Sequence, residues 1–240
     1  MDKITSKTNS KIKDLVRLHK SKEREKMGYF LVEGFHMLEM ALKANVVKEV
    51  YTLKQLDLPS DITQYLVTEE IIDKISINKS SQGVVAKCVL LKKKLNNQDK
   101  IIYLDNISDP GNLGTILRTA LAFDYFDVIK SPNSVSIYNE KSLSATQGAV
   151  FELNIIDKDY EVLLDLKNRG YLIVVTSLRN AMLLSDITIP QKCVLVFGNE
   201  GQGVRKEILE IADITIKIPI NNIESLNVGV AAGILMHHFR

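Results

Sequence analysis

Two short apolar runs, each ending in a loop of small polar residues, most strongly constrain how this 240-residue chain can fold. Residues 193–197 lead into the glycine-rich loop 198–203, and residues 214–219 lead into the polar loop 220–227. A helical pattern follows each loop. In an open α/β sheet, ligands bind where strands end in such loops, so we expect a binding site here.

Strand and helix patterns alternate from residue 99 onward. The apolar runs predict strands at residues 100–105, 126–130, 149–156, 171–176 and 194–197. Amphipathic segments predict helices at residues 112–123, 160–169, 204–211 and 227–239. Such alternation implies an α/β domain with a mostly parallel sheet covered on both faces.

The first part of the chain is typical of a smaller α/β/α unit. Strands are predicted at residues 29–33, 46–53 and 84–91, with helices near residues 10–18, 34–45 and 69–75. A polar segment without periodicity follows at residues 92–98. We therefore expect a small domain at residues 1–91, a linker at 92–98 and the larger domain at 99–240.

Charge is distributed unevenly, although the net charge is only +2. Residues 1–98 carry 18 Lys and Arg against 12 Asp and Glu, whereas residues 99–240 carry 13 against 17. The basic first part suggests a polyanion such as RNA as partner, and the acidic remainder argues against a chain that simply coats nucleic acid. The basic side chains at residues 11–26 fit a solvated surface equally well.

Cysteine content and hydropathy exclude several classes of protein. Cys88 and Cys193 are too few for a metal cluster and predict buried thiols in a reducing compartment. No apolar run approaches 18 residues, and the lysine-rich N-terminus does not resemble a signal peptide. We expect a cytoplasmic protein without a metal and without a membrane partner.

A third loop with functional potential follows the predicted strand at residues 100–105. It contains Asp109-Pro110-Gly111-Asn112 and leads into a helix that carries Arg118. Asn112 can cap this helix, and turn or cap roles alone would account for Asp109 and Asn112. Arg118 lies among small and apolar neighbours, so its charge should need an anionic partner.

The two C-terminal loops have features of their own. The glycine order at residues 198–203 is G-x-x-G-x-G, which is neither the dinucleotide fingerprint nor a P-loop. Phosphate cradling is therefore disfavoured, while Glu200 can bind a hydroxyl or a cation. Ser225 can cap the last helix, and capping alone would explain both Ser225 and Asn227.

Together, these three segments resemble the three motifs of the SpoU-type (TrmH-like) RNA 2′-O-ribose methyltransferases of the SPOUT superfamily. Residues 4–13, 30–34 and 81–84 are similar to that family's N-terminal substrate-binding domain, which resembles ribosomal protein L30e. Two positions depart from the family pattern, since Ile220 and Gly229 stand where Met and Ser are common.

The resemblance implies S-adenosylmethionine as methyl donor, a structured RNA as substrate, and a homodimer whose active site lies at the subunit interface. It also implies a C-terminal trefoil knot, a rare exception to unknotted chains. Large-subunit ribosomal RNA is the family's commonest substrate for this domain arrangement, and transfer RNA is second. Two alternatives stay open: an inert RNA-binding protein on the same fold, and a doubly wound NAD-dependent oxidoreductase, which the glycine order disfavours.

Matched position by position, the resemblance implies a catalytic set and a donor-binding set. The catalytic set is Asn112, Arg118, Glu200, Ser225 and Asn227, and the donor-binding set is Thr176, Gly198, Ile218 and Leu226. Glu200 would orient Arg118 or the sugar, and Ser225 would contact the phosphate. Arg118 would accept a proton or clamp the phosphate and hydroxyl; both roles stay open, because a pKa above ~12 makes arginine a poor base at neutral pH.

Overall fold

The computed structural model describes residues 2–77, 81–177 and 181–240, which form two compact units. Unit 1 contains the chain up to Lys92 together with Tyr138–Phe151, and unit 2 contains Lys93–Ile137 and Glu152–Arg240. The sequence pattern placed residues 138–151 in the larger domain, whereas their contacts group them with unit 1.

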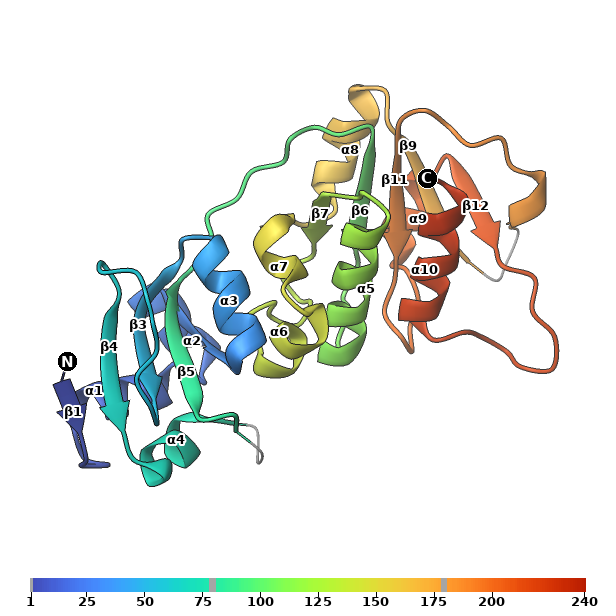
Figure 1. The fold of residues 1–240 in the computed structure, drawn as a ribbon. Helices are drawn as coiled ribbons and strands as arrows, with labels where there is room; N and C mark the ends of the chain where they lie inside the picture. Colours follow the sequence, from blue (N-terminus) through green and yellow to red (C-terminus); the bar gives the residue numbers. More distant parts are fainter. Residues whose placement is uncertain (1, 78–80, 178–180) are drawn as a thin grey trace. The chain divides into compact units, whose positions relative to one another are not determined.

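A five-stranded sheet in the order β1-β4-β3-β5-β2 forms the centre of unit 1 (Figure 1). Its strands are β1 (Asp2–Ile4), β2 (Tyr29–Glu33), β3 (Val47–Thr52), β4 (Thr63–Val67) and β5 (Val84–Val89). Its helices are α1 (Ser10–Arg17), α2 (Ser21–Met27), α3 (Phe35–Lys43) and α4 (Glu69–Ile75). The sequence patterns did not predict β1, β4 or α2.

The strand directions in this sheet place the carboxyl ends of four strands at one edge. β1, β4 and β3 pair in parallel, and both β3 and β2 pair antiparallel with β5. The carboxyl ends of β1, β2, β3 and β4 therefore lie at the same edge as the start of β5.

Helix α1 shows how the local sequence builds the unit 1 core. Asn9 caps the helix by accepting a hydrogen bond from the Lys11 N–H, and Ile12 and Leu15 are buried beneath it. Arg24, expected among the solvated basic residues, is instead buried and donates to the carbonyl oxygens of Leu18 and His19. It therefore ties the end of α1 to α2 and is not free to contact a phosphate.

The strand predicted at residues 149–156 is wrong in its first half. Its beginning forms the short helix α7 (Ala149–Glu152), preceded by α6 (Glu140–Thr146), and β8 (Asn154–Asp157) starts only afterwards. Phe151 and Tyr138 pack on the ring of buried Phe30, with centroid distances of 6.4 and 4.6 Å. The apolar residues at 149–151 therefore complete the core of unit 1, and only residues from 154 onward enter a sheet.

Unit 2 confirms the predicted α/β class with a parallel sheet. Seven strands in the order β10-β12-β9-β11-β6-β7-β8 pair in parallel throughout (Figure 1). Besides β8, they are β6 (Lys100–Leu104), β7 (Asp127–Lys130), β9 (Leu172–Thr176), β10 (Met182–Leu183), β11 (Cys193–Phe197) and β12 (Ile214–Lys217). The helices are α5 (Pro110–Ala122), α8 (Glu161–Asn168), α9 (Lys206–Ile211) and α10 (Val228–His238).

Both faces of the central strands of unit 2 are buried. Leu163 and Leu166 of α8 and Ile208 of α9 join one apolar cluster with alternate residues of β6, β9 and β11. Helices α5 and α10 pack against each other, with Leu117 and Leu235 buried. This two-sided burial explains why the strands have nearly continuous apolar sequences.

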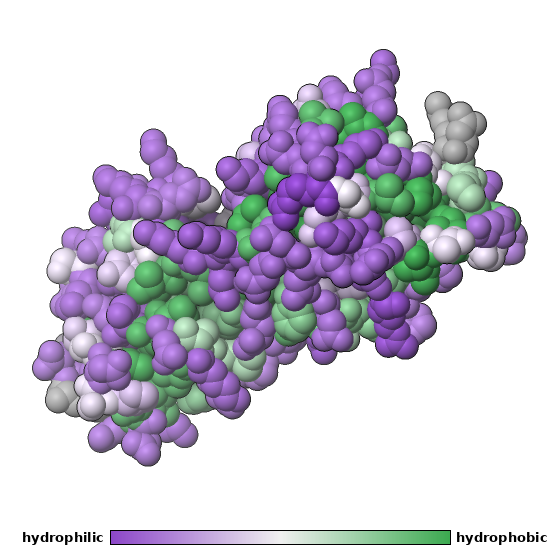
Figure 2. All heavy atoms as spheres, turned by 90° about the horizontal axis from the view of Figure 1, so that it is seen from above, coloured by the Kyte–Doolittle hydropathy of each residue, from purple (hydrophilic) through white to green (hydrophobic). Residues whose placement is uncertain are grey.

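Cys88 and Cys193 are buried free thiols, as predicted, and burial raises the pKa of the Cys193 thiol to about 11. Within the described residues, no helix combines the length and the hydrophobicity needed to span a bilayer. The face in Figure 2 is mostly hydrophilic, with separate apolar patches.

Tyr138→Ala should destabilise the protein by about 2–4 kcal/mol, because it removes an aromatic contact with Phe30 and leaves a cavity. Tyr138→Phe is the matched control: it loses only the hydroxyl that accepts from the Leu91 N–H, so about 1 kcal/mol is expected. Denaturant unfolding measures both. Equal losses in the two variants would contradict the assignment of residues 138–151 to the unit 1 core.

Candidate functional site

The site lies where the order of the parallel strands in unit 2 reverses. The chain passes from β6 outward to β7 and β8, then returns on the other side of β6 through β9 and β11. The loops that follow the neighbouring strands β6 and β11 therefore diverge around a crevice at the carboxyl edge of the sheet. Such a reversal is the general position of ligand sites in open α/β sheets.

Glu200 connects these two loops. Its Oε2 accepts hydrogen bonds from the N–H and hydroxyl of Ser108, at 3.2 and 2.8 Å. Its Oε1 accepts from the Asp109 N–H and from Asn112 Nδ2, both at 3.1 Å. One carboxylate from the β11 loop thus holds the whole β6 loop and the first turn of α5.

Asn112 extends these contacts to the third segment. Asn227 Nδ2 donates to Asn112 Oδ1 at 2.8 Å, while Asn227 Oδ1 accepts from the N–H groups of Gly229 and Val230. The role of cap therefore falls to Asn227 in α10 and not to Ser225. In α5 it falls to Asp109, which accepts from the Asn112 N–H, and not to Asn112 as predicted.

The orientation of both amides follows from these contacts. The Glu200 carboxylate can only accept, so Asn112 must present its NH₂ to Glu200 and its oxygen to Asn227. Asn227 must present its oxygen to the start of α10, which leaves its NH₂ for Asn112. The two requirements agree, so the Glu200–Asn112–Asn227 network has one consistent hydrogen-bond direction.

The network lowers the pKa of Glu200. Partial burial alone would raise this pKa, but hydrogen bonds from Asn112, the Glu200 backbone, Ser108 and Asp109 outweigh it and bring the pKa to about 2. Glu200 is therefore a carboxylate at neutral pH and is not a general acid.

Close contact between α5 and α10 sets the distance from Asn112 to Asn227. A Cβ atom added to Gly229 would lie 3.2 Å from Thr115 Cγ2, and one added to Gly233 would lie 3.6 Å from Thr119 Cγ2. Small residues spaced four apart on both helices allow this approach. Gly229, which departs from the family pattern, thus has a packing role.

A second fixed contact between the same loops, which the sequence analysis does not predict, joins Arg205 to Asp105. The Arg205 N–H and Nε donate to the two oxygens of fully buried Asp105, at 2.8 and 2.6 Å. Arg205 Nη2 also donates to Asp159 at 2.7 Å. An acid at the end of an apolar strand was the available signal, because a buried carboxylate needs a partner.

A cavity of 770 Å³ opens beside the network. Its lining includes every predicted site residue except Arg118: Asn112, Thr176, Gly198, Glu200, Ile218, Ser225, Leu226 and Asn227. Four segments separated in sequence thus surround one cavity of the size that small-molecule ligands occupy.

Arg118 is placed differently from the other predicted residues. It is exposed on α5, and no ion pair or hydrogen bond joins it to another side chain in the described part of the chain. The described residues therefore hold no anionic partner for Arg118, and the contacts of Glu200 go to the β6 loop and Asn112 instead of Arg118.

Family comparisons agree with this geometry. Residues 99–237 match the SpoU rRNA Methylase family, and residues 9–86 match the MRM3-like substrate binding domain. The chain is 35% identical over 247 residues to the 23S rRNA (guanosine(2553)-2′-O)-methyltransferase RlmP of Bacillus subtilis, with 100% of both chains covered. It is 33% identical over 167 residues to the tRNA (guanosine(18)-2′-O)-methyltransferase of Aquifex aeolicus, covering 64% of this chain and 79% of that one.

A solved structure is similar to this chain over its whole length. The AdoMet-bound rRNA methyltransferase from Sinorhizobium meliloti superposes with a TM-score of 0.90 at 26% identity, covering 100% of this chain and 97% of that one.

Glu200→Gln should change how stability depends on pH. Because the folded-state pKa lies below the ordinary 4.5, Glu200 contributes stability above about pH 4.5 that is lost as the pH falls toward 2. The variant should lose stability at pH 7 and show a smaller further loss across that window. Thermal unfolding measured from pH 7 to pH 2.5 checks this. If the melting temperature falls with pH equally in both proteins, the Glu200 network does not cause the pH dependence of stability.

Proposed function

We propose that this chain, which belongs to the SpoU rRNA methylase family, transfers a methyl group from S-adenosylmethionine to a ribose 2′-oxygen of large-subunit ribosomal RNA. The observation that carries the proposal is the Glu200–Asn112–Asn227 network, which joins three loops beside one cavity. Full-length similarity to a 23S rRNA methyltransferase supports ribosomal RNA over transfer RNA.

The cavity fits S-adenosylmethionine better than NAD. Apolar side chains such as Leu209, Ile216 and Leu226 can cover the faces of an adenine. The carboxylates of Glu200 and Glu224 suit a cationic donor, whereas Lys217 is the one cation among the lining residues that the structure describes. A pyrophosphate would find little positive charge here.

Methyl transfer requires alignment, proton removal and control of the RNA phosphate. When bound, the donor supplies an electrophilic methyl group to which the 2′-oxygen forms a bond as the carbon–sulfur bond breaks. Glu200, Asn112 and Asn227 fix the loops that position the sugar, and such alignment is worth roughly 7–11 kcal/mol in well-oriented reactions. Ser225, exposed at the cavity, can donate its hydroxyl to the phosphate.

The role proposed for Arg118 depends on a second subunit. Arg118 lies on α5 beside α10, where Val230 and Ile234 are 53% and 38% exposed at one-turn spacing. Pairing of two copies through this face would cover both apolar residues and give Arg118 a partner site. We infer a homodimer of this kind, in which Arg118 either accepts the proton of the 2′-hydroxyl or clamps the phosphate and that hydroxyl.

Three further features come with the family assignment. We infer a trefoil knot in the C-terminal part, a location in the cytoplasm, and a guanosine as the modified nucleotide, as in the relatives' names. Intact Asn112, Glu200 and Asn227 favour an active enzyme over an inert RNA-binding protein.

Mapping of 2′-O-methyl groups in 23S rRNA and tRNA from cells with and without the gene tests the function. One ribosomal position should lose its methyl group in the deletion strain and regain it on complementation. Loss of a tRNA methyl group instead would transfer the assignment to tRNA, and no change in either RNA would overturn it.

Gly198→Ala should weaken S-adenosylmethionine binding at least 10-fold. The added Cβ would overlap the backbone of Gly203 and Val204, so the loop could not close as it does. Gly201→Ala is the matched control, because its Cβ would meet only Asn199 Oδ1, at 3.7 Å. Calorimetry measures both, and NAD binding by the unchanged protein would refute the donor assignment.

Arg118→Ala should lower kcat by roughly 10²–10⁴-fold and leave donor affinity and melting temperature nearly unchanged, because the side chain is exposed. Arg118→Lys keeps the charge and loses the planar fork. Near-normal kcat with a raised KM for RNA in both variants would reduce Arg118 to an electrostatic anchor.

Val230→Asp should convert the dimer into a monomer that retains donor binding and loses methyl transfer, because a carboxylate cannot be buried unpaired in an apolar interface. Light scattering after size-exclusion chromatography measures the mass. Lys43→Ala, an exposed change in unit 1, is the control. A monomeric unchanged protein would overturn the dimer proposal.

A further inference from the structure

Unit 1 presents a cluster of exposed apolar side chains at one edge of its sheet. Among the described residues of this unit, the exposed large hydrophobic side chains are Phe35, Leu53 and Ile77, with 39%, 41% and 45% exposure. Phe35 and Leu53 follow β2 and β3 at the edge where β1, β2, β3 and β4 end and β5 begins, and Ile77 reaches this edge through its hydrogen bond to Glu33. We call this the strand-end surface.

Hydrogen bonds tie each of the three residues to a neighbouring segment of the same edge. The Phe35 N–H donates to Gln82 Oε1 at 2.8 Å, and the Leu53 N–H donates to the oxygen of Gly83 at 3.1 Å. The Ile77 N–H donates to Glu33 Oε1 at 2.7 Å, two residues before Phe35. The backbone N–H groups of all three residues are therefore fixed by hydrogen bonds to side-chain or backbone oxygens.

Two glycines allow this close arrangement. Gly34 and Gly83 have backbone φ angles of +87° and +75°, which residues other than glycine rarely adopt. A Cβ on Gly34 would lie 2.9 Å from Gln82 Oε1, and one on Gly83 would lie 2.8 Å from Leu53 Cδ1. The backbone turns that expose Phe35 and Leu53 thus depend on glycine.

The charge around this surface is nearly balanced. Lys54 and His36 are exposed beside Leu53 and Phe35, while Lys7 pairs with Glu70 at 3.0 Å. In contrast, the α1–α2 region carries exposed cations for which no side-chain partner is found in the described part of the chain: Lys13, Lys20, Lys22 and Lys26. The two regions suit different parts of one ligand, since the first offers apolar contact and the second offers charge.

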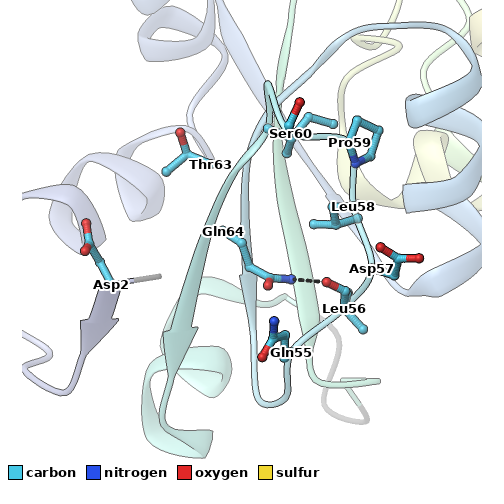
Figure 3. A pocket seen from close by; sticks show the side chains of 10 residues that line it. Asp2, Gln55, Leu56, Asp57, Leu58, Pro59, Ser60, Thr63 and Gln64 are labelled. Carbon is cyan, nitrogen blue, oxygen red and sulfur yellow. Dashed lines mark hydrogen bonds between the residues drawn. The ribbon is translucent and has the colours of Figure 1, made fainter.

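The opposite edge of the sheet is chemically unlike the strand-end surface. A cavity of 460 Å³ lies there, near the starts of β1 and β4, and Asp2 and Asp57 are among its lining residues (Figure 3). Gln64 crosses it and donates to the Leu56 oxygen at 3.5 Å. Two carboxylates without a lining cation disfavour a polyanion in this cavity.

We propose that the strand-end surface binds an unpaired base of the substrate RNA, with the Phe35 ring as stacking platform and Leu53 and Ile77 at its sides. This inference rests on the proposed function, because it assumes an RNA substrate. Sequence-specific contacts to RNA are made mostly with unpaired bases, which stack on aromatic rings. The lysines of the α1–α2 region bind phosphates elsewhere on the same RNA.

Salt dependence separates stacking from charge attraction. Phe35→Ala should weaken binding of unmodified 23S rRNA transcript about 10-fold at every salt concentration, leaving the slope of log K against log salt unchanged. Lys22→Ala, the control, should reduce that slope by about one unit, as expected for one lost phosphate contact. Phe35→Tyr should keep affinity, whereas Phe35→Leu should not, because only tyrosine retains the ring.

Each other outcome decides against the inference. Full affinity in Phe35→Ala, or rescue by leucine as strong as by tyrosine, overturns base stacking. A change in molecular mass in Phe35→Ala would assign the surface to a second copy of the chain. In all variants, the S-adenosylmethionine affinity and the melting temperature should match those of the unchanged protein. If the unchanged protein does not methylate the RNA, the proposed function is contradicted, and not the base-stacking inference.

Discussion

The geometry of the unit 2 site depends on the Glu200 carboxylate. Its two oxygens accept from Ser108, Asp109 and Asn112, so one side chain fixes the loop after β6 and the start of α5. Because a carboxylate accepts only, it also determines which way the Asn112 amide points and therefore what Asn227 donates to. The hydrogen-bond direction that Glu200 imposes on Asn112 agrees with the one that the cap of α10 imposes on Asn227. Loops from three parts of the chain can therefore be joined by one hydrogen-bond network.

Other contacts in unit 2 hold the loops that carry this network at the required distances. Parallel pairing of β6 and β11 brings their loops to the same edge, and Arg205 on Asp105 fixes the end of the β11 loop to the end of β6. Gly229 and Gly233 let α10 approach α5 closely enough for the 2.8 Å contact between Asn227 and Asn112. The polar site is therefore a consequence of sheet topology and helix packing, while the exposed Arg118 lies outside the residues that line the cavity.

Much of the architecture was predictable from local patterns, and the failures have physical causes. The strand at residues 29–33 was predicted to the residue, because Gly28 and Gly34 bound a continuous apolar run. The run at 149–156 was misassigned because a short apolar segment can also be a helix that packs on a distant ring, here Phe30. The resemblance predicts the candidate site residues, but helix caps and hydrogen-bond partners follow only from the three-dimensional structure: Asp105 lies 100 residues before Arg205, and no local pattern relates them.

The most direct test of the central claim is a double-mutant cycle between Asn112 and Asn227, measured as kcat/KM for methylation of ribosomal RNA. Asn227→Ser retains an oxygen that can cap α10 but loses the NH₂ that donates to Asn112, and Asn112→Ala removes the acceptor. If the network acts as a unit, the double variant should be little worse than the poorer single variant, with a coupling energy of about 1–2 kcal/mol. Strictly additive losses would show that the two residues act independently and would contradict the account.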